Sequence, residues 1–237
     1  IYGYDITSAY FLSSAFANNG DAQSVTIKVS RLKNILFSNC RIRNIKNEFY
    51  TFDLYHVYNI QFYYCNIDNI TGGILSVKDS VRFKMDNLII KGINVSQQTA
   101  FCFLHVKTVS AENVSVSQAK TSVFLIKYSV KISLTQANFH NIESHNHSEF
   151  SVISVIFHQK LFQPKLHIVN SIFLSCSANK MSGVLMVYPT SEVDVHRNSM
   201  LNAVTKLHLN ISKHTDILYL RIVDSVFKKC NSKAGSG

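Results

Sequence analysis

The stretch Ile60-Gln61-Phe62-Tyr63-Tyr64-Cys65-Asn66-Ile67-Asp68-Asn69-Ile70 decides the fold of this 237-residue chain. Aliphatic or phenyl side chains stand at its first, third, eighth and eleventh positions, and a polar residue precedes the last of them. The alternation at the start has a period of two, which is typical of a strand with one buried face. The stretch therefore predicts two short strands that are separated by a sharp corner near Tyr64.

The same pattern recurs along the chain. Seven other segments carry apolar residues at the same four positions, with 23 to 34 residues between successive segments. Only 46% of all residues are apolar, so chance does not explain four apolar columns in eight segments. The last apolar residues of the eight segments, which anchor the alignment, are Ile45, Ile70, Ile93, Ala119, Ile142, Cys176, Ala203 and Cys230.

The columns between the apolar ones are polar. The position before the anchor never holds an apolar residue, and the position six before it is rich in asparagine. Asparagine tolerates the left-handed backbone of a tight bend, and its amide can bond to the equivalent amide one coil away, at about 4.8 Å. Repeats of this length, with β-branched and aromatic runs, predict an all-β protein: a right-handed parallel β-helix of about eight or nine coils.

The repeat frame also divides the chain. Residues 31–237 are predicted to form the β-helix and to continue into further chain or a neighbouring subunit. Residues 1–30 fit the frame poorly and are expected to form an irregular first coil, or a cap with a short helix around residues 7–16. The chain has only two prolines. Because proline cannot donate to a strand ladder, both Pro164 and Pro189 are expected in turns or loops.

Charge and hydropathy narrow the range of partners. The net charge is +10, from 24 basic and 14 acidic residues, which favours anionic partners such as acidic glycans. No nucleic-acid-binding motif accompanies the charge, so no nucleic-acid partner is predicted. No apolar run reaches the roughly 18 residues of a membrane-spanning helix, so none is predicted in this segment.

Three segments resemble a known family. The run Asn170-Ser171-Ile172-Phe173-Leu174-Ser175-Cys176, followed by Ser182-Gly183-Val184-Leu185, resembles a degenerate repeat of the polymorphic outer-membrane-protein type, which pairs F-x-x-N with G-G-[AVIL]-[IL]. Residues 224–230 repeat its first half, and residues 67–75 are a third copy. Cysteine or isoleucine replaces the asparagine, so the likeness extends best to the wider pectate-lyase-like superfamily of right-handed β-helices. The resemblance implies a secreted or surface-exposed protein that is used in adhesion.

The expected function is therefore a structural or adhesive segment of a large extracellular or cell-surface protein. Its partners would be other protein chains or further copies of itself, including a filament built by end-to-end stacking, and also anionic glycans. The alternative is a carbohydrate-active enzyme or a binding module that acts on acidic polysaccharide, because such enzymes share this fold. Fold alone does not decide between these functions.

No catalytic site, metal site or cofactor is predicted, although two groups of residues were weighed. Asp194, His196 and Arg197 lie close enough in sequence to share a catalytic face, but the favoured interpretation is that they are surface polar residues. His145 and His147, with Glu143 nearby, have the spacing of metal ligands on a strand, and the alternative is a plain polar loop.

The sequence contains sites that permit N-linked glycosylation of a secreted protein. Five Asn-x-Ser/Thr sequons, which are the acceptor sites for N-linked glycans, occur at Asn69, Asn94, Asn113, Asn146 and Asn210. Five tyrosines, at positions 50, 55, 58, 63 and 64, are expected either to bind sugar or protein or to stack between coils.

The five cysteines are also placed by the repeat frame. Cys40 and Cys65 share a column in successive coils, within disulfide reach, so they are either a disulfide or two stacked thiols. Cys176 and Cys230 share a column two coils apart, roughly 9.6 Å at the strand spacing, and are expected to be unbridged core residues, like Cys102.

Overall fold

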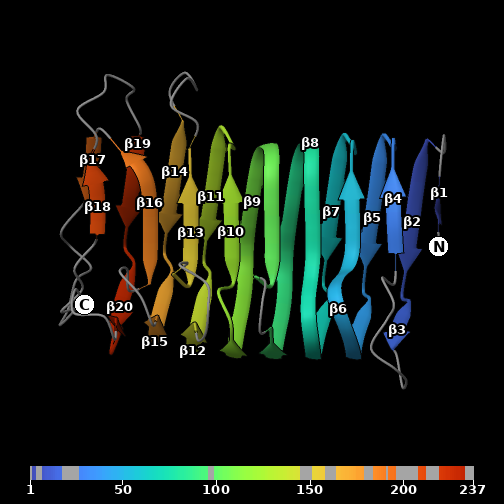
Figure 1. The fold of residues 1–237 in the computed structure, drawn as a ribbon, viewed down its shortest axis with the longest axis horizontal. Helices are drawn as coiled ribbons and strands as arrows, with labels where there is room; N and C mark the ends of the chain where they lie inside the picture. The colour runs from blue at the N-terminus through green and yellow to red at the C-terminus, as the bar shows by residue number, and fades with distance from the viewer. Residues whose placement is uncertain are drawn as a thin grey trace.

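The computed structural model is an all-β parallel solenoid, or β-helix, in which the chain winds around one long axis (Figure 1). The structure describes residues 2–3, 7–17, 27–95, 99–144, 151–157, 164–178, 184–190, 192–195, 208–211 and 219–232. Its 21 described strands belong to one hydrogen-bonded sheet that winds back on itself, and all the pairings between them are parallel.

Each coil, meaning one turn of the chain, passes over three faces. The first face contains β2 (Ser8–Leu12), β5 (Asn34–Ser38), β7 (Asn59–Tyr63), β11 (Lys131–Thr135), β14 (Lys165–Val169), β19 (Tyr219–Val223) and β17 (Glu192–Val195). The second face contains β3 (Ala15–Ala17), β12 (Asn138–Ser144), β15 (Ile172–Ala178), β20 (Val226–Lys228) and β21 (Asn231–Ser232). The third face contains β1 (Tyr2–Gly3), β4 (Ile27–Ser30), β10 (Phe124–Lys127), β13 (Ile153–Ile156), β16 (Leu185–Thr190) and β18 (His208–Ile211). Three long strands pass over more than one face: β6 (Arg41–Tyr55), β8 (Asn66–Asn94) and β9 (Phe101–Lys120).

The apolar columns of the repeat line the interior. Ile35, Ile60, Phe83 and Val109 lie in register on successive coils, and each is almost fully buried. In the stretch that opened the repeat, Ile60, Phe62, Ile67 and Ile70 are likewise buried. The predicted period of two on the strands is therefore confirmed.

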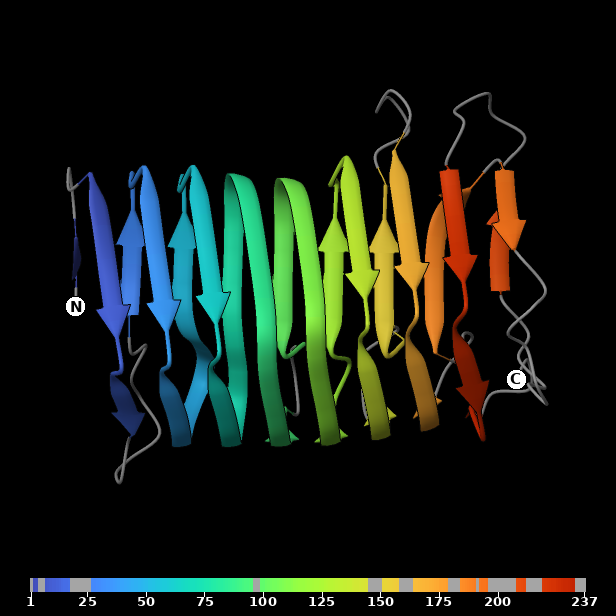
Figure 2. The ribbon, with the colours of Figure 1, turned by 180° about the vertical axis from the view of Figure 1, so that it is seen from behind.

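The regular part of the solenoid is shorter than the eight or nine coils expected. Five regular turns are marked by residues that stack in register on the third face, and the even succession of coils is visible from behind in Figure 2. These residues are Ile27, Phe52, Leu75, Phe101, Phe124 and Ile153. Further strands stack at both ends, in chain order at the N-terminal end and out of chain order near the C-terminal end. Residues 8–12 and 15–17 form strands that pair with β5 and β6, not the short helix that was one alternative for this segment.

Left-handed backbone conformations build the corners, as the polar columns predicted. Every described residue of the two columns has a positive φ, for example 55° at Asn39, 54° at Asn87 and 53° at Asn69. A third corner lies between the third and the first face. The sequence pattern did not predict it, because this corner is not rich in asparagine. It consists of Arg31, His56, Asp79, His105 and Tyr128, with φ between 48° and 61°.

Strand order departs from chain order near the C-terminal end. β19 pairs with β14 on one side and with β17 on the other, so β19 lies between two strands that precede it in the chain. β20 consequently stacks directly on β15. Pro164 lies outside the strands, as expected, but Pro189 lies within β16, which corrects that expectation. The β16–β18 register is irregular between Val187 and Thr190, and such bulges tolerate proline.

Candidate functional site

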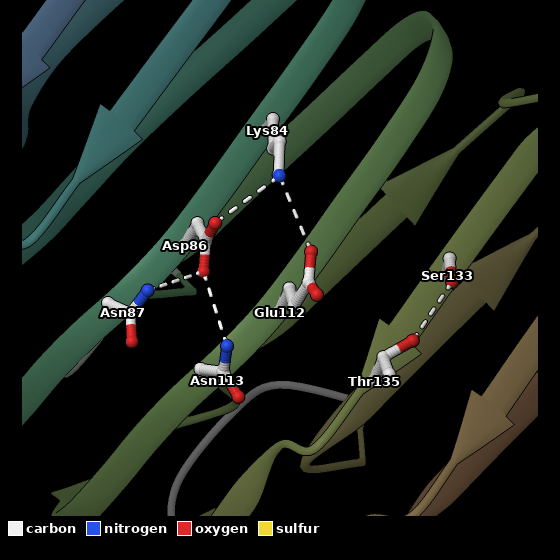
Figure 3. Close-up of polar contacts among 7 residues, drawn as sticks. All are labelled: Lys84, Asp86, Asn87, Glu112, Asn113, Ser133 and Thr135. Atoms are coloured by element: carbon white, nitrogen blue, oxygen red, sulfur yellow. Dashed lines mark hydrogen bonds and ion pairs between the residues drawn. The ribbon is translucent and has the colours of Figure 1, made fainter.

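A polar cluster on the first face is the best-connected group of charged side chains in the described part of the chain (Figure 3). Lys84 and Asp86 point outward from β8, and Glu112 lies in register with Asp86 on the next coil. The Lys84 Nζ is 3.3 Å from Asp86 Oδ2 and 3.3 Å from Glu112 Oε2. The lysine therefore joins two carboxylates on neighbouring coils.

Corner asparagines extend this cluster. Asn87 donates a hydrogen bond to Asp86 Oδ1 at 2.8 Å, and Asn113 donates to the same oxygen at 3.4 Å. The Tyr63 ring lies on the other side, with its centroid 5.6 Å from Lys84 Nζ. The side-chain amides of the corner asparagines thus donate to Asp86 from two neighbouring coils.

The electrostatics of Lys84 follow from these contacts. Burial alone would lower the pKa of Lys84, but hydrogen bonds from its ammonium to Asp86 and Glu112 raise that pKa above the ordinary value. The cluster is exposed enough for solvent to screen it, so each ion pair contributes about 0–1 kcal/mol. The arrangement links coils and presents a patterned polar surface.

Amide ladders run along the solenoid at two further positions. Asn69 donates to Asn44 Oδ1 at 2.8 Å between adjacent corners, which is the amide stacking predicted for this column. Asn59 donates to Asn34 Oδ1 at 3.4 Å on the first face. Such ladders fix the register because each amide bonds to its own equivalent one coil away.

A half-buried tyrosine, Tyr50, lies where the second face meets the third. The Tyr50 hydroxyl is 3.5 Å from Thr99 Oγ1, and burial raises the pKa of Tyr50. Its ring lies against Gly73, where an added Cβ would collide with it. Cys102 lies beside Tyr50 and is half-buried on the outward side of β9, which corrects its expected place in the core.

The other predicted tyrosines do not share one row. Tyr58 and Tyr64 are exposed, whereas Tyr55 and Tyr63 are half-buried. Tyr64 occupies a left-handed corner with φ of 51°, and Tyr63 contacts Lys84. Only part of this set is therefore available to a ligand.

Three of the predicted sequons are accessible. The side chains of Asn69, Asn94 and Asn113 are exposed. Asn210 lies in the backbone of β18, and Asn146 lies outside the described residues.

The two candidate groups for metal binding and catalysis are only partly described. Glu143 is exposed on β12, whereas His145 and His147 lie outside the described residues. Asp194 belongs to the backbone of β17, and His196 and Arg197 also lie outside. Within the described ranges, no three histidine, cysteine or acidic side chains are close enough to hold a metal ion.

Both cysteine pairs lie in neighbouring coils. Arg41 and Asn66 lie in register, which places the preceding residues, Cys40 and Cys65, next to each other on adjacent coils. Both cysteines are buried and carry free thiols. Each donates to a backbone carbonyl, and burial raises the pKa of Cys65 to about 11. Their disulfide stays a prediction.

Cys176 and Cys230 require a correction. They lie in adjacent coils, not two coils apart, because β20 stacks on β15 without an intervening coil. Each thiol donates to backbone carbonyls, Cys176 to that of Leu174 and Cys230 to that of Lys228. The adjoining Cys230 thiol and burial raise the pKa of Cys176, whereas the adjoining Cys176 thiol lowers the pKa of Cys230.

The sequence patterns missed the Lys84 cluster, although a signal existed. Asp86 and Glu112 occupy one column of the repeat, and Lys84 stands two residues before Asp86, on the same side of the strand. Comparing charges column by column would have found it.

Comparisons with known proteins identify no relative of this chain. No protein-family model matches the chain, and neither curated proteins nor solved structures give a match. The described part of the chain also contains no helix with the length and hydropathy needed to span a membrane.

Proposed function

We propose that the chain is a structural and adhesive segment of a larger extracellular or cell-surface protein. The observation that carries this proposal is the continuity of its faces, where outward side chains stay in register from coil to coil. A surface of this kind is rigid, extended and suited to presenting repeated contacts to another chain. The resemblance of residues 170–185 to adhesin-type repeats of the pectate-lyase-like superfamily supports the same assignment.

Exposed apolar side chains indicate where this surface would contact another chain. Tyr64 and Ile89 have 61% and 58% of their surface exposed. Ile89 donates its backbone N–H to the carbonyl of Cys65, the residue after Tyr64, so both belong to one small area of adjoining coils. Clustered exposed apolar side chains mark interaction sites on protein surfaces.

An adhesion assay tests the proposal. Beads coated with the protein are expected to bind a monolayer of cultured cells better than beads coated with albumin. Tyr64→Ser with Ile89→Ser should reduce binding, whereas Ile172→Ser, in the same outward column several coils away, should not. Equal binding of protein-coated and albumin-coated beads would contradict an adhesive role. Release of reducing ends from polygalacturonate by the same preparation would instead favour the alternative enzyme.

The proposed extracellular location is supported by exposed glycosylation sequons and can be tested by deglycosylation. Asn69, Asn94 and Asn113 are exposed and lie within sequons. After expression through a secretory pathway, intact mass is expected to fall on enzymatic deglycosylation. An unchanged mass would count against secretion.

A further inference from the structure

Basic side chains gather on the first face where it is formed by β11, β14 and β19. Lys131 and Lys165 lie in register on neighbouring coils, and both are exposed. Two residues beyond Lys165, His167 lies in register with Arg221. Four nitrogen-bearing side chains thus occupy three adjacent strands, with about 4.8 Å between strands.

Among the described side chains, these basic groups have no carboxylate partner of the kind that Lys84 has. Within the described residues, no ion pair is formed by Lys131, Lys165 or Arg221. Two acidic residues of β17 adjoin the group: Glu192 lies in register with Tyr219, and Asp194 lies in register with Arg221. Like charges at this spacing repel one another, so an anion placed over them would relieve the repulsion.

His167 gives a second, independent indication of a ligand. Its Nε2 is buried and has no hydrogen-bond partner among the described residues. Buried polar atoms are nearly always hydrogen-bonded, and an exception calls for an explanation such as a bound group. Burial of the ring and the three neighbouring cations also hold the pKa of His167 below its ordinary value, and a bound anion would offset the repulsion by the cations.

An aromatic ring completes the patch. Tyr219 is 37% exposed, lies in register with Lys165, and meets the His167 ring edge-to-face at 5.6 Å. Cations beside an exposed aromatic ring suit a sugar that carries carboxylate or sulfate groups, because the ring packs on the apolar face of the sugar and the cations bind its charge.

We propose that Lys131, Lys165, His167, Arg221 and Tyr219 bind an acidic polysaccharide along the first face. The proposal names a partner for the surface protein and rests on that proposed function, but it uses a patch distinct from Tyr64 and Ile89. An extended polyanion fits because the basic groups repeat from coil to coil. Single-stranded nucleic acid fits less well, because its recognition needs successive stacking rings, and Tyr219 is the one exposed ring in the described part of this patch.

Binding measurements on the full 237-residue chain test this. Dextran sulfate and polygalacturonate are expected to bind, and uncharged dextran of matched length is not. Lys131→Gln with Lys165→Gln should weaken binding by roughly tenfold, which corresponds to about 1.4 kcal/mol. The matched control is Arg43→Gln with Lys91→Gln, which removes the same charge from exposed positions on the second face and should leave affinity unchanged.

Three results would overturn the proposal. If the unmodified chain binds neither polyanion, the proposed binding site does not exist. Equal weakening by the two double variants would reduce the effect to net charge. Tighter binding of a polythymidine oligonucleotide than of the polyanionic sugars would assign the patch to nucleic acid. Cell adhesion through Tyr64 and Ile89 is measured separately, so failure of the glycan site and failure of the adhesive function remain distinguishable.

Discussion

Cys176 and Cys230 lie side by side in adjacent coils although 54 residues separate them in the chain. The close approach of the two thiols shifts their pKa values in opposite directions. The pKa of Cys230 falls because Cys176 stabilises its thiolate, and the pKa of Cys176 rises by the same contact and by burial. Cys230, which is also the less buried of the two, is therefore the more reactive thiol.

Alkylation rates should reveal this split. Cys230 is half-buried, whereas Cys65 and Cys176 are buried, and thiolate is the reactive species. Iodoacetamide at mildly alkaline pH is expected to modify Cys230 before Cys65 and Cys176, as followed by peptide mass mapping. Cys176→Ala removes the neighbouring thiol that lowers the pKa of Cys230 and should slow the modification of Cys230. Faster modification of Cys230 in that variant would be incompatible with the contact.

The local parts of the fold could be predicted from the sequence. Inward columns such as Ile35, Ile60 and Phe83 follow from alternation, since a strand with one buried face repeats every two residues. Corners such as Asn39 and Asn69 follow from the backbone preference of asparagine. Both features depend on residues only a few positions apart.

The strand order at the C-terminal end could not be predicted in this way. The succession of similar repeats implied that each segment stacks on the one before it. β19 instead lies between β14 and β17, and nothing local in the sequence of β19 distinguishes one parallel neighbour from another. The same limit explains the missed Lys84 cluster, because its ion pairs depend on which coils adjoin, and that order must be known before charges can be matched.

Stacked phenylalanines make the core cooperative across coils. The Phe173 ring packs parallel to Phe139 at 4.8 Å and to Phe227 at 4.6 Å between centroids. Phe173→Ala should lower the free energy of unfolding by about 3–5 kcal/mol, because it leaves a cavity between two other rings. Phe49→Ala removes a ring that is 59% exposed and should change stability by less than about 0.5 kcal/mol. Urea unfolding measures both, and similar losses in the two variants would contradict the stacking.

Two glycines with positive φ should respond differently to substitution. Gly72 has φ of 110°, and an added Cβ would collide with the backbone oxygen and side chain of Asn47. Gly72→Ala is therefore expected to cost about 1–3 kcal/mol from the backbone conformation alone, with the collision in addition. Gly92 has φ of 66°, and its nearest neighbour to an added Cβ is the Asn69 nitrogen at 3.5 Å.

Gly92→Asn is the matched control for Gly72→Ala. The same corner column already holds Asn44 and Asn69 in this conformation, so asparagine should be accepted with a change within about 0.5 kcal/mol. Thermal unfolding of the two variants gives the comparison. A Gly92→Asn loss as large as that of Gly72→Ala would mean that the corner does not favour asparagine.

The acid sensitivity of the first face is expected to depend on His167. Burial and repulsion by Lys131, Arg221 and Lys165 hold the pKa of His167 below its ordinary value in the folded chain, and Tyr219 is the remaining titratable side chain in contact with the ring. In the unfolded chain the imidazole recovers a pKa near about 6.5. Below that pH the unfolded chain binds a proton that the folded chain resists. The free energy of unfolding should therefore fall as pH decreases from about 6.5 through the lowered folded value.

Replacing the imidazole separates this effect from general acid denaturation. His167→Asn should make the urea midpoint depend less on pH over this range, whereas His140→Asn, at an exposed position of β12, should leave the dependence of the unmodified chain in place. Dextran sulfate should reduce the slope of the unmodified chain, because a bound anion favours the protonated ring. Identical slopes for the unmodified chain and His167→Asn would show that the three cations do not act on this histidine.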